Sequence, residues 1–228
     1  MIVIRNVCWV LIFLWTGTAW PAAGQDGRSP DERLLRQIYA ADADAFAATM
    51  RAFDVTSYAL FAAVPAGTFA YAYAADRPDL RAPAYRIALS EAAALAGVVV
   101  LKRLYARPRP YAELDGIRSR AVGLDRWVLS HDTLSFPSGH AALSFAVATS
   151  VALSGAEWYV TAAAFVWAGA VATSRLWLGV HYPTDVLAGA AIGAAAGAGV
   201  HLLRHHVTPA WIAGRDASPV SIRLSIAL

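Results

Sequence analysis

The residues best suited to chemistry begin with a cluster of positive side chains that ends at two prolines. Lys102, Arg107 and Arg109 fall within eight residues, and Pro108 and Pro110 follow the two arginines. A proline disfavours helix for the residue before it, so Arg107 and Arg109 are expected in an extended segment beyond a helix that carries Lys102. Guanidinium and ammonium groups held in this way suit a phosphate. A simple anchor that flanks a membrane helix is the alternative interpretation.

A second group opens an apolar stretch further along the chain. Pro137, Ser138, Gly139 and His140 precede the uncharged run 141–156. In the purely structural interpretation, Ser138 is a helix N-cap and Gly139 a turn residue. The same helix start would expose backbone N–H groups that can bind an anion, and His140 beside that anion could act as a general acid.

A third group combines an arginine, a histidine and an aspartate. Arg175 follows Ser174, and His181 and Asp185 come after gaps of five and three residues. Pro183 and Asp185 fit the first turn of a helix, so a capping role for Asp185 stays open. Alternatively, the carboxylate accepts one ring N–H of His181 and leaves the other nitrogen free to attack. Arg175 would add another donor for phosphate.

Helices must position these groups, and several are long enough to cross lipid. Residues 55–75 carry no charge and have the length of ~20 residues that a membrane span needs. Residues 31–53 have apolar side chains at steps of three and four, which predicts an amphipathic helix along an interface or against the bundle. A soluble helical bundle with a very apolar core is the alternative. Weaker candidate spans are 87–101, 141–156, 158–174 and 186–203.

The alternating direction of successive spans predicts that the three groups lie at the same membrane surface. If residues 55–75 run inward, the arginine-containing loop 77–86 is cytoplasmic, as the positive-inside bias favours. The next helix then runs outward, and 141–174 forms a hairpin that returns to the same face. Three segments are therefore predicted to meet at the outer membrane surface: 102–110, 137–140 and 174–185.

The composition limits the possible classes of protein. Apolar residues make up 58% and charged residues 15% of the 228 residues, which argues against disorder and against an ordinary cytosolic enzyme. A net charge of +3 gives no indication of nucleic acid binding. Residues 1–24 have the basic start, apolar run and small residues of a secretory signal peptide, with an uncleaved first span as the alternative. That segment contains Cys8, the single cysteine.

The three groups together resemble the signature motifs of the type 2 phosphatidic acid phosphatase superfamily, which also includes bacterial acid phosphatases and vanadium haloperoxidases. The match covers about residues 102–185, and the surrounding helices are similar to the membrane-bound branch. The resemblance implies an all-α fold, namely a multi-span helical membrane bundle with a six-helix-type phosphatase core. The matching positions are Lys102, Arg109, Pro110, Pro137, Ser138, Gly139, His140, Ser174, Arg175, His181 and Asp185.

The resemblance also implies a role for each residue. His181 would be the nucleophile that forms a phosphohistidine, Asp185 its partner, and His140 the acid that protonates the leaving oxygen. No metal or other cofactor is expected, because cations and a helix start can stabilise the transferred phosphoryl group. The phosphoryl oxygens would be held by Lys102, Arg109, Ser138, Gly139 and Arg175.

The expected function is removal of phosphate from a lipid phosphate or lipid pyrophosphate at the periplasmic face of a bacterial inner membrane. The expected partners are the lipid substrate and membrane lipids, without nucleic acid. A soluble exported acid phosphatase and a non-catalytic membrane transport or binding protein are the alternatives. The predicted organisation is a signal peptide or first span at 1–24, an amphipathic interfacial helix within 25–54, a phosphatase domain at 55–206, and a tail with a possible short strand at 207–228.

Residues next to the motifs are open to several interpretations. His131 and Asp132 could touch a substrate head group, because they lie just before the second group. Trp127, Phe136 and Trp177 fit an anchor at the membrane interface better than a contact to acyl chains.

Overall fold

The computed structural model describes residues 28–41 and 44–213, and its regular elements are helices. The predicted signal segment and the alternating residues near the C-terminus lie outside this part. The long helices are α2 (Pro30–Tyr39), α3 (Asp44–Ala74), α4 (Arg81–Tyr105), α7 (Gly139–Leu153), α8 (Trp158–Trp177) and α9 (Pro183–Leu202). The short elements are η1 (Pro78–Leu80), α5 (Pro110–Glu113), α6 (Gly123–His131) and α10 (Arg204–Val207).

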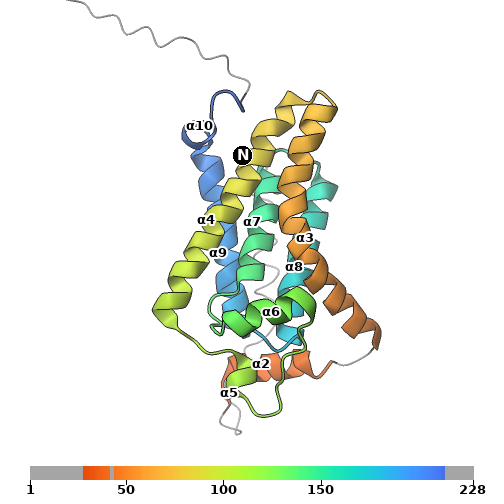
Figure 1. Ribbon diagram of the computed structural model, residues 1–228, viewed down its shortest axis with the longest axis vertical. Helices are drawn as coiled ribbons and strands as arrows, with labels where there is room; N and C mark the ends of the chain where they lie inside the picture. The colour runs from red at the N-terminus through yellow and green to blue at the C-terminus, as the bar shows by residue number, and fades with distance from the viewer. Residues whose placement is uncertain (1–27, 42–43, 214–228) are drawn as a thin grey trace, which may run out of the picture.

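Five helices run along the long axis of the molecule, and smaller elements cover one end. Figure 1 shows α3, α4, α7, α8 and α9 side by side, with α2, α5 and α6 gathered at the lower end and α10 at the upper end. Three described helical stretches are long and apolar enough to cross a membrane: Phe46–Ala74, Pro78–Tyr105 and Pro183–Leu202. The predicted all-α membrane bundle is confirmed.

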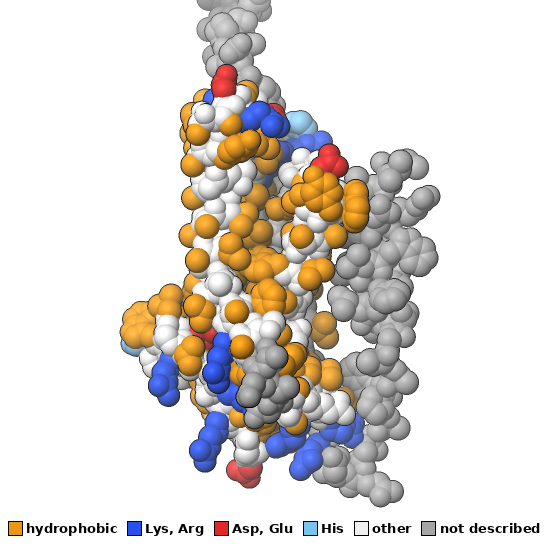
Figure 2. Space-filling model, turned by 90° about the vertical axis from the view of Figure 1, so that its right-hand side faces the viewer, with side chains coloured by type: hydrophobic (Ala, Val, Ile, Leu, Met, Phe, Trp, Pro, Cys, Tyr) orange, Lys and Arg blue, Asp and Glu red, His pale blue; other side chains and the backbone are white. Residues whose placement is uncertain are grey.

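The surface agrees with this arrangement. Figure 2 shows hydrophobic side chains along the length of the bundle and blue Lys and Arg side chains gathered at its lower end. Large apolar side chains on the long helices are exposed, among them Val100 at 57%, Val166 at 72% and Leu187 at 65%. An apolar surface of this kind suits contact with hydrocarbon, because a soluble protein rarely exposes such a continuous apolar area.

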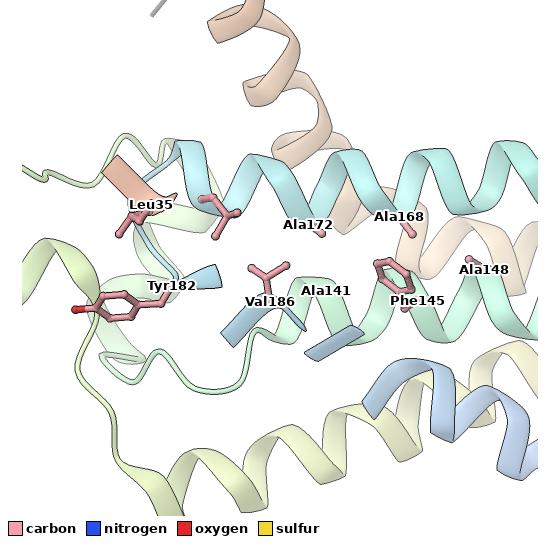
Figure 3. Packing of buried hydrophobic residues seen from close by; sticks show 9 residues of the cluster. Leu35, Ala141, Phe145, Ala148, Ala168, Ala172, Tyr182 and Val186 are labelled. Carbon is pink, nitrogen blue, oxygen red and sulfur yellow. The ribbon is translucent and has the colours of Figure 1, made fainter. Parts of the chain in front are cut away.

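Small residues let the central helices approach closely. Figure 3 shows Ala141, Phe145 and Ala148 of α7 packed beside Ala168 and Ala172 of α8. On the other side of α7, a Cβ at Gly189 or Gly193 of α9 would overlap the carbonyl oxygens of Ser138 and Ala142, respectively. Contacts through small residues are typical of helices that pack within membranes. The close packing of α7 and α9 joins two of the predicted site segments.

The first helices differ from the prediction of one amphipathic helix over 31–53 followed by a separate span. α2 ends at Tyr39, and α3 continues without interruption from Asp44 to Ala74. Neither Pro nor Gly lies between Phe53 and Val55, so nothing in the backbone ends the helix there. The charge of Asp54 is accommodated because its side chain is buried against an arginine, as described below.

Trp177 is not an interface anchor, contrary to the prediction. It is fully buried in the last turn of α8, and its indole Nε1 donates to the carbonyl of Ala41 at 2.7 Å. The guanidinium of Arg120 stacks on its ring at 4.6 Å from the centroid. Trp127, in contrast, is 61% exposed, as an anchor at the membrane interface requires.

Candidate active site

The three predicted segments meet at the lower end of the bundle. α4 ends at Tyr105, and the chain then runs extended into Arg109, as the prolines predicted. The Ser135 N–H donates to the Arg107 carbonyl at 2.8 Å, and the Ser138 N–H donates to the Asp185 carbonyl at 2.9 Å. These bonds link the segment before α7 to both of the others, which confirms the predicted convergence.

His181 has one ring nitrogen against a permanent positive charge. Its Nε2 lies 3.1 Å from a terminal nitrogen of Arg109, and its side chain is 3% exposed. A guanidinium can only donate, so Nε2 must be the acceptor and the neutral ring carries its proton on Nδ1. Nδ1 lies 3.5 Å from Oδ2 of Asp185. This tautomer leaves the lone pair of Nε2 directed at the cationic part of the site.

Asp185 has the capping role and also lies beside the histidine. Its Oδ2 accepts the backbone N–H of Tyr182 at 2.8 Å at the start of α9. Its Oδ1 accepts from Arg107 at 2.9 Å, and that guanidinium also stacks 3.7 Å above the Tyr182 ring. The other terminal nitrogen of Arg107 pairs with Asp31 of α2 at 2.8 Å. The carboxylate is therefore fixed on two sides, and its 3.5 Å separation from His181 Nδ1 leaves that nitrogen without a hydrogen-bond partner among the described residues.

Burial sets the protonation of His181. Desolvation lowers the pKa of its imidazole well below the usual 6.5, and the charges of Arg109 and Arg175 act in the same direction. The ring is therefore neutral at neutral pH. A neutral imidazole is required of a nucleophile, because protonation removes the attacking lone pair.

Lys102 and Arg109 share one carboxylate. Lys102 Nζ donates to Asp132 Oδ2 and to the Leu134 carbonyl, both at 2.6 Å. Arg109 reaches the same Oδ2 at 3.2 Å and also donates to the Val180 carbonyl at 3.0 Å. Asp132, considered from the sequence as a head-group contact, thus joins the two cations that were expected to hold phosphate.

Arg175 lies at the same end of the bundle as Lys102 and Arg109, but it does not share Asp132 with them. Its side chain is 1% exposed and lies between two buried aspartates, Asp54 of α3 and Asp125 of α6. One terminal nitrogen donates to Asp54, and the other donates to both oxygens of Asp125 at 3.0 Å. Sequence reasoning missed both aspartates. The available signal was Asp54 itself, a charge inside a continuous apolar helix, which usually marks a functional position.

His140 lies next to this pair of aspartates. The Tyr58 ring packs edge-on against it with centroids 4.7 Å apart. Its Nε2 is buried and has no hydrogen-bond partner within the described chain. Ser138 is the N-cap of α7, as in its structural interpretation, and accepts from the Ala141 N–H at 3.4 Å, while Gly139 is the first helical residue.

One group of side chains has the spacing of a metal site. Potential ligand atoms of Asp54, Asp125 and His140 lie within 4.8 Å of one another. Both carboxylates, however, are paired with Arg175, and a divalent cation would have to compete with that guanidinium. This donor set favours a structural ion pair over a metal ion.

The fold and the site define a multi-span helical membrane protein with histidines, aspartates and cations clustered at one end of its bundle. Residues 83–209 match the PAP2 superfamily. The chain belongs to this superfamily, and the resemblance drawn from its motifs is confirmed.

Two curated relatives match shorter regions. The chain is 33% identical over 99 residues to the bacitracin transport permease protein BcrC of Bacillus licheniformis, a match covering 41% of this chain and 42% of that protein. It is 37% identical over 73 residues to the lipid A 4'-phosphatase of Bacteroides thetaiotaomicron, covering 32% of each. The chain thus spans less than half the length of these relatives.

Two solved structures share the fold. LpxE of Aquifex aeolicus superposes with a TM-score of 0.61 at 23% identity, over 79% of this chain and 99% of that one. The transmembrane PAP2-type phosphatidylglycerolphosphate phosphatase of Bacillus subtilis superposes with a TM-score of 0.60 at 23% identity, over 88% of this chain and 96% of that one. At this identity the likeness concerns the architecture of the bundle.

Proposed function

We propose that the protein is a phosphohydrolase that removes phosphate from a lipid phosphate or lipid pyrophosphate through a phosphohistidine intermediate. The observation that carries the proposal is the placement of His181. Its Nε2 accepts from Arg109 at 3.1 Å while Asp185 lies 3.5 Å from Nδ1. A neutral imidazole with one nitrogen near a carboxylate and the other beside cations suits attack on phosphorus.

The reaction proceeds in two steps. In the first, a phosphoryl oxygen takes over the Arg109 N–H that His181 Nε2 accepts, which frees the lone pair of Nε2. Nε2 then forms a bond to phosphorus as the bond to the leaving oxygen breaks, and protonated His140 gives that oxygen a proton. In the second, water attacks the phosphohistidine and gives its proton to His140, the N–P bond breaks, and inorganic phosphate leaves. Lys102, Arg109, Arg175 and the start of α7 stabilise the charge of the phosphoryl oxygens in both steps.

The membrane bundle supports a lipid substrate. The site lies at the end of helices that carry exposed apolar side chains, so a lipid could keep its chains beside the bundle while its head group reaches His181. Two similar proteins, a lipid A 4'-phosphatase and a phosphatidylglycerolphosphate phosphatase, support the same class of substrate by their names. We propose that the chain takes one of these anionic lipids or a close analogue.

Phosphate release by the purified protein tests the proposal. We expect release from at least one member of a panel of lipid phosphates and pyrophosphates, and its loss in His181→Ala. His205→Ala is the matched control, since His205 is exposed on α10 at the opposite end. Equal release by wild type and His181→Ala would contradict the mechanism, and release from soluble phosphate esters alone would contradict the lipid substrate.

We further propose that the site faces the periplasm of a bacterial inner membrane. The loop with Arg77 and Arg81 at the other end favours a cytoplasmic position there, but the site end also carries many arginines, so the charges alone do not decide the orientation. Single cysteines in a Cys8→Ser background test it, at Ser119 on the site end and Ser154 on the opposite end. An impermeant maleimide applied to intact cells with a permeable outer membrane should label Ser119→Cys and spare Ser154→Cys. The reverse pattern would place the site in the cytoplasm.

A further inference from the structure

The buried cluster around Arg175 contains more negative charge than its one arginine requires. Asp54 is 0%, Asp125 2% and Arg175 1% exposed. Two carboxylates therefore share one guanidinium away from water, and one of them, Asp54, lies in a helix with the length and composition of a membrane span. Buried charges are costly even when paired, and within membrane helices they usually mark a functional position.

The two terminal nitrogens of the Arg175 guanidinium are bound by carboxylates, whereas its Nε is not. Asp54 takes one terminal nitrogen, and Asp125 takes the other through both carboxylate oxygens at 3.0 Å. The Nε of Arg175 is buried and bonds to no residue in the described ranges. Buried donors are almost always satisfied, so Nε–H is the group of Arg175 that can still donate to a phosphoryl oxygen.

The same carboxylates connect Arg175 to His140. Asp125 Oδ1 also accepts the hydroxyl of Tyr58 at 2.9 Å, and the Tyr58 ring packs against the His140 ring. A nitrogen of His140 lies within 4.8 Å of an oxygen of each aspartate. Its Nε2, like the Nε of Arg175, is buried without a hydrogen-bond partner in the described part of the chain.

We propose that Asp54 and Asp125 are positioning residues of the phosphate site. They hold the two terminal nitrogens of Arg175 from α3 and α6, so that this arginine contacts the phosphoryl group through Nε–H alone, and the Tyr58 hydroxyl keeps Asp125 in place by donating to its Oδ1. This inference rests on the proposed phosphatase function and adds residues outside the superfamily match, since Asp54 and Tyr58 precede residue 83.

A double-mutant cycle on purified protein tests the inference. We expect Asp125→Asn and Arg175→Gln each to lower kcat by about tenfold or more, with a smaller change in KM, because orientation matters most in the transition state. The double variant should lose no more than about twofold beyond Arg175→Gln, because Asp125 acts through Arg175. Multiplied losses in the double variant, or unchanged kcat in Asp125→Asn, would overturn the inference.

Two further variants separate positioning from a failure to fold. Tyr58→Phe removes only the hydroxyl that reaches Asp125, and it should lower kcat by about threefold in wild type and have no effect beside Arg175→Gln. Asp79→Asn is the matched control, because it breaks an exposed Asp–Arg pair at the opposite end and should leave kcat unchanged. If Asp125→Asn does not fold, a Tyr58→Phe protein with wild-type kcat overturns the inference by itself.

The two proposals fail in different ways. If wild type and His181→Ala release phosphate equally, the phosphatase mechanism fails whatever the aspartates do. If His181→Ala is inactive and the cycle shows independent effects, the mechanism stands and the positioning role of Asp54 and Asp125 fails.

Discussion

Every cation expected to hold phosphate has a carboxylate partner in this structure. Lys102 and Arg109 share Asp132, and Arg175 lies between two other aspartates. A carboxylate and a phosphoryl oxygen compete for the same donors. The half-exposed Asp132 is therefore the group that an incoming phosphate would displace from Lys102 and Arg109.

Removal of this competing charge should strengthen the binding of inorganic phosphate. We expect Asp132→Asn to lower the inhibition constant for phosphate by about twofold to fivefold, because one partly exposed charge pair contributes up to about 1 kcal/mol. Phosphate inhibition of lipid hydrolysis is the measurement. The control is Asp115→Asn, an exposed aspartate at the same end. Weaker phosphate binding in Asp132→Asn would instead show that Asp132 organises the two cations.

The pH dependence follows from His181. Burial and the neighbouring Arg109 lower the pKa of its imidazole well below 6.5, so we expect the proposed nucleophile to stay neutral through mild acid and activity to fall only at lower pH. Unfolding restores the ordinary pKa, so the unfolded chain takes up a proton first and the free energy of unfolding falls as pH drops below about 6.5. The profile of kcat/KM should show its acid limb below pH 6.5. An acid limb above that value would mean that His181 is protonated in the folded protein.

The sequence predicted the residues of the site better than their partners. The proline signals correctly predicted the extended Arg109, and the serine signal offered the N-cap Ser138 as its structural interpretation, because such signals depend on the local backbone. Asp54 carried a signal as a charge within an apolar run, but the pairing of Asp54 and Asp125 with Arg175 could not be predicted, since these residues meet only after α3, α6 and α8 have packed. The local sequence around Arg175 could not show that two carboxylates already bind its terminal nitrogens.

At the level of helices, α7 and α9 depend on glycine where they touch. A side chain at Gly193 would overlap the backbone of Ala142, whereas Gly199 on the same helix has open space. We expect Gly193→Ala to destabilise the protein by about 1–3 kcal/mol through overpacking, and Gly199→Ala to be neutral or slightly stabilising through helix propensity. Thermal unfolding in detergent measures both. Equal unfolding temperatures for the two variants would contradict the close packing.

The helices themselves were largely predictable. The four weaker candidate spans correspond to α4, α7, α8 and α9, because uncharged runs and helix ends leave clear signals. The join between residues 53 and 55 was not predictable, since a charge at that point is typical of a helix that leaves the membrane. Only the partner on α8 explains why α3 continues past Asp54.

For the molecule as a whole, the cluster of cations predicts a metal-independent reaction. Phosphate release should survive a chelator, because Lys102, Arg109 and Arg175 supply the positive charge that a metal ion would otherwise provide. Assays in EDTA, with and without added magnesium, measure this. Complete loss in EDTA that magnesium restores would instead assign the Asp54, Asp125 and His140 group to a metal ion.

The Ser138 N–H donates to the Asp185 carbonyl, and Gly189 of α9 packs against the backbone of Ser138. These two contacts hold the start of α7 and the start of α9 together as one rigid unit. His140, the proposed acid, lies on one half of that unit, and His181, the proposed nucleophile, immediately precedes the other. A tilt of the outer helices in bilayers of different thickness would then leave the separation of these two histidines unchanged. We expect changes of lipid specificity to be concentrated in α3, α4 and the segment 114–136.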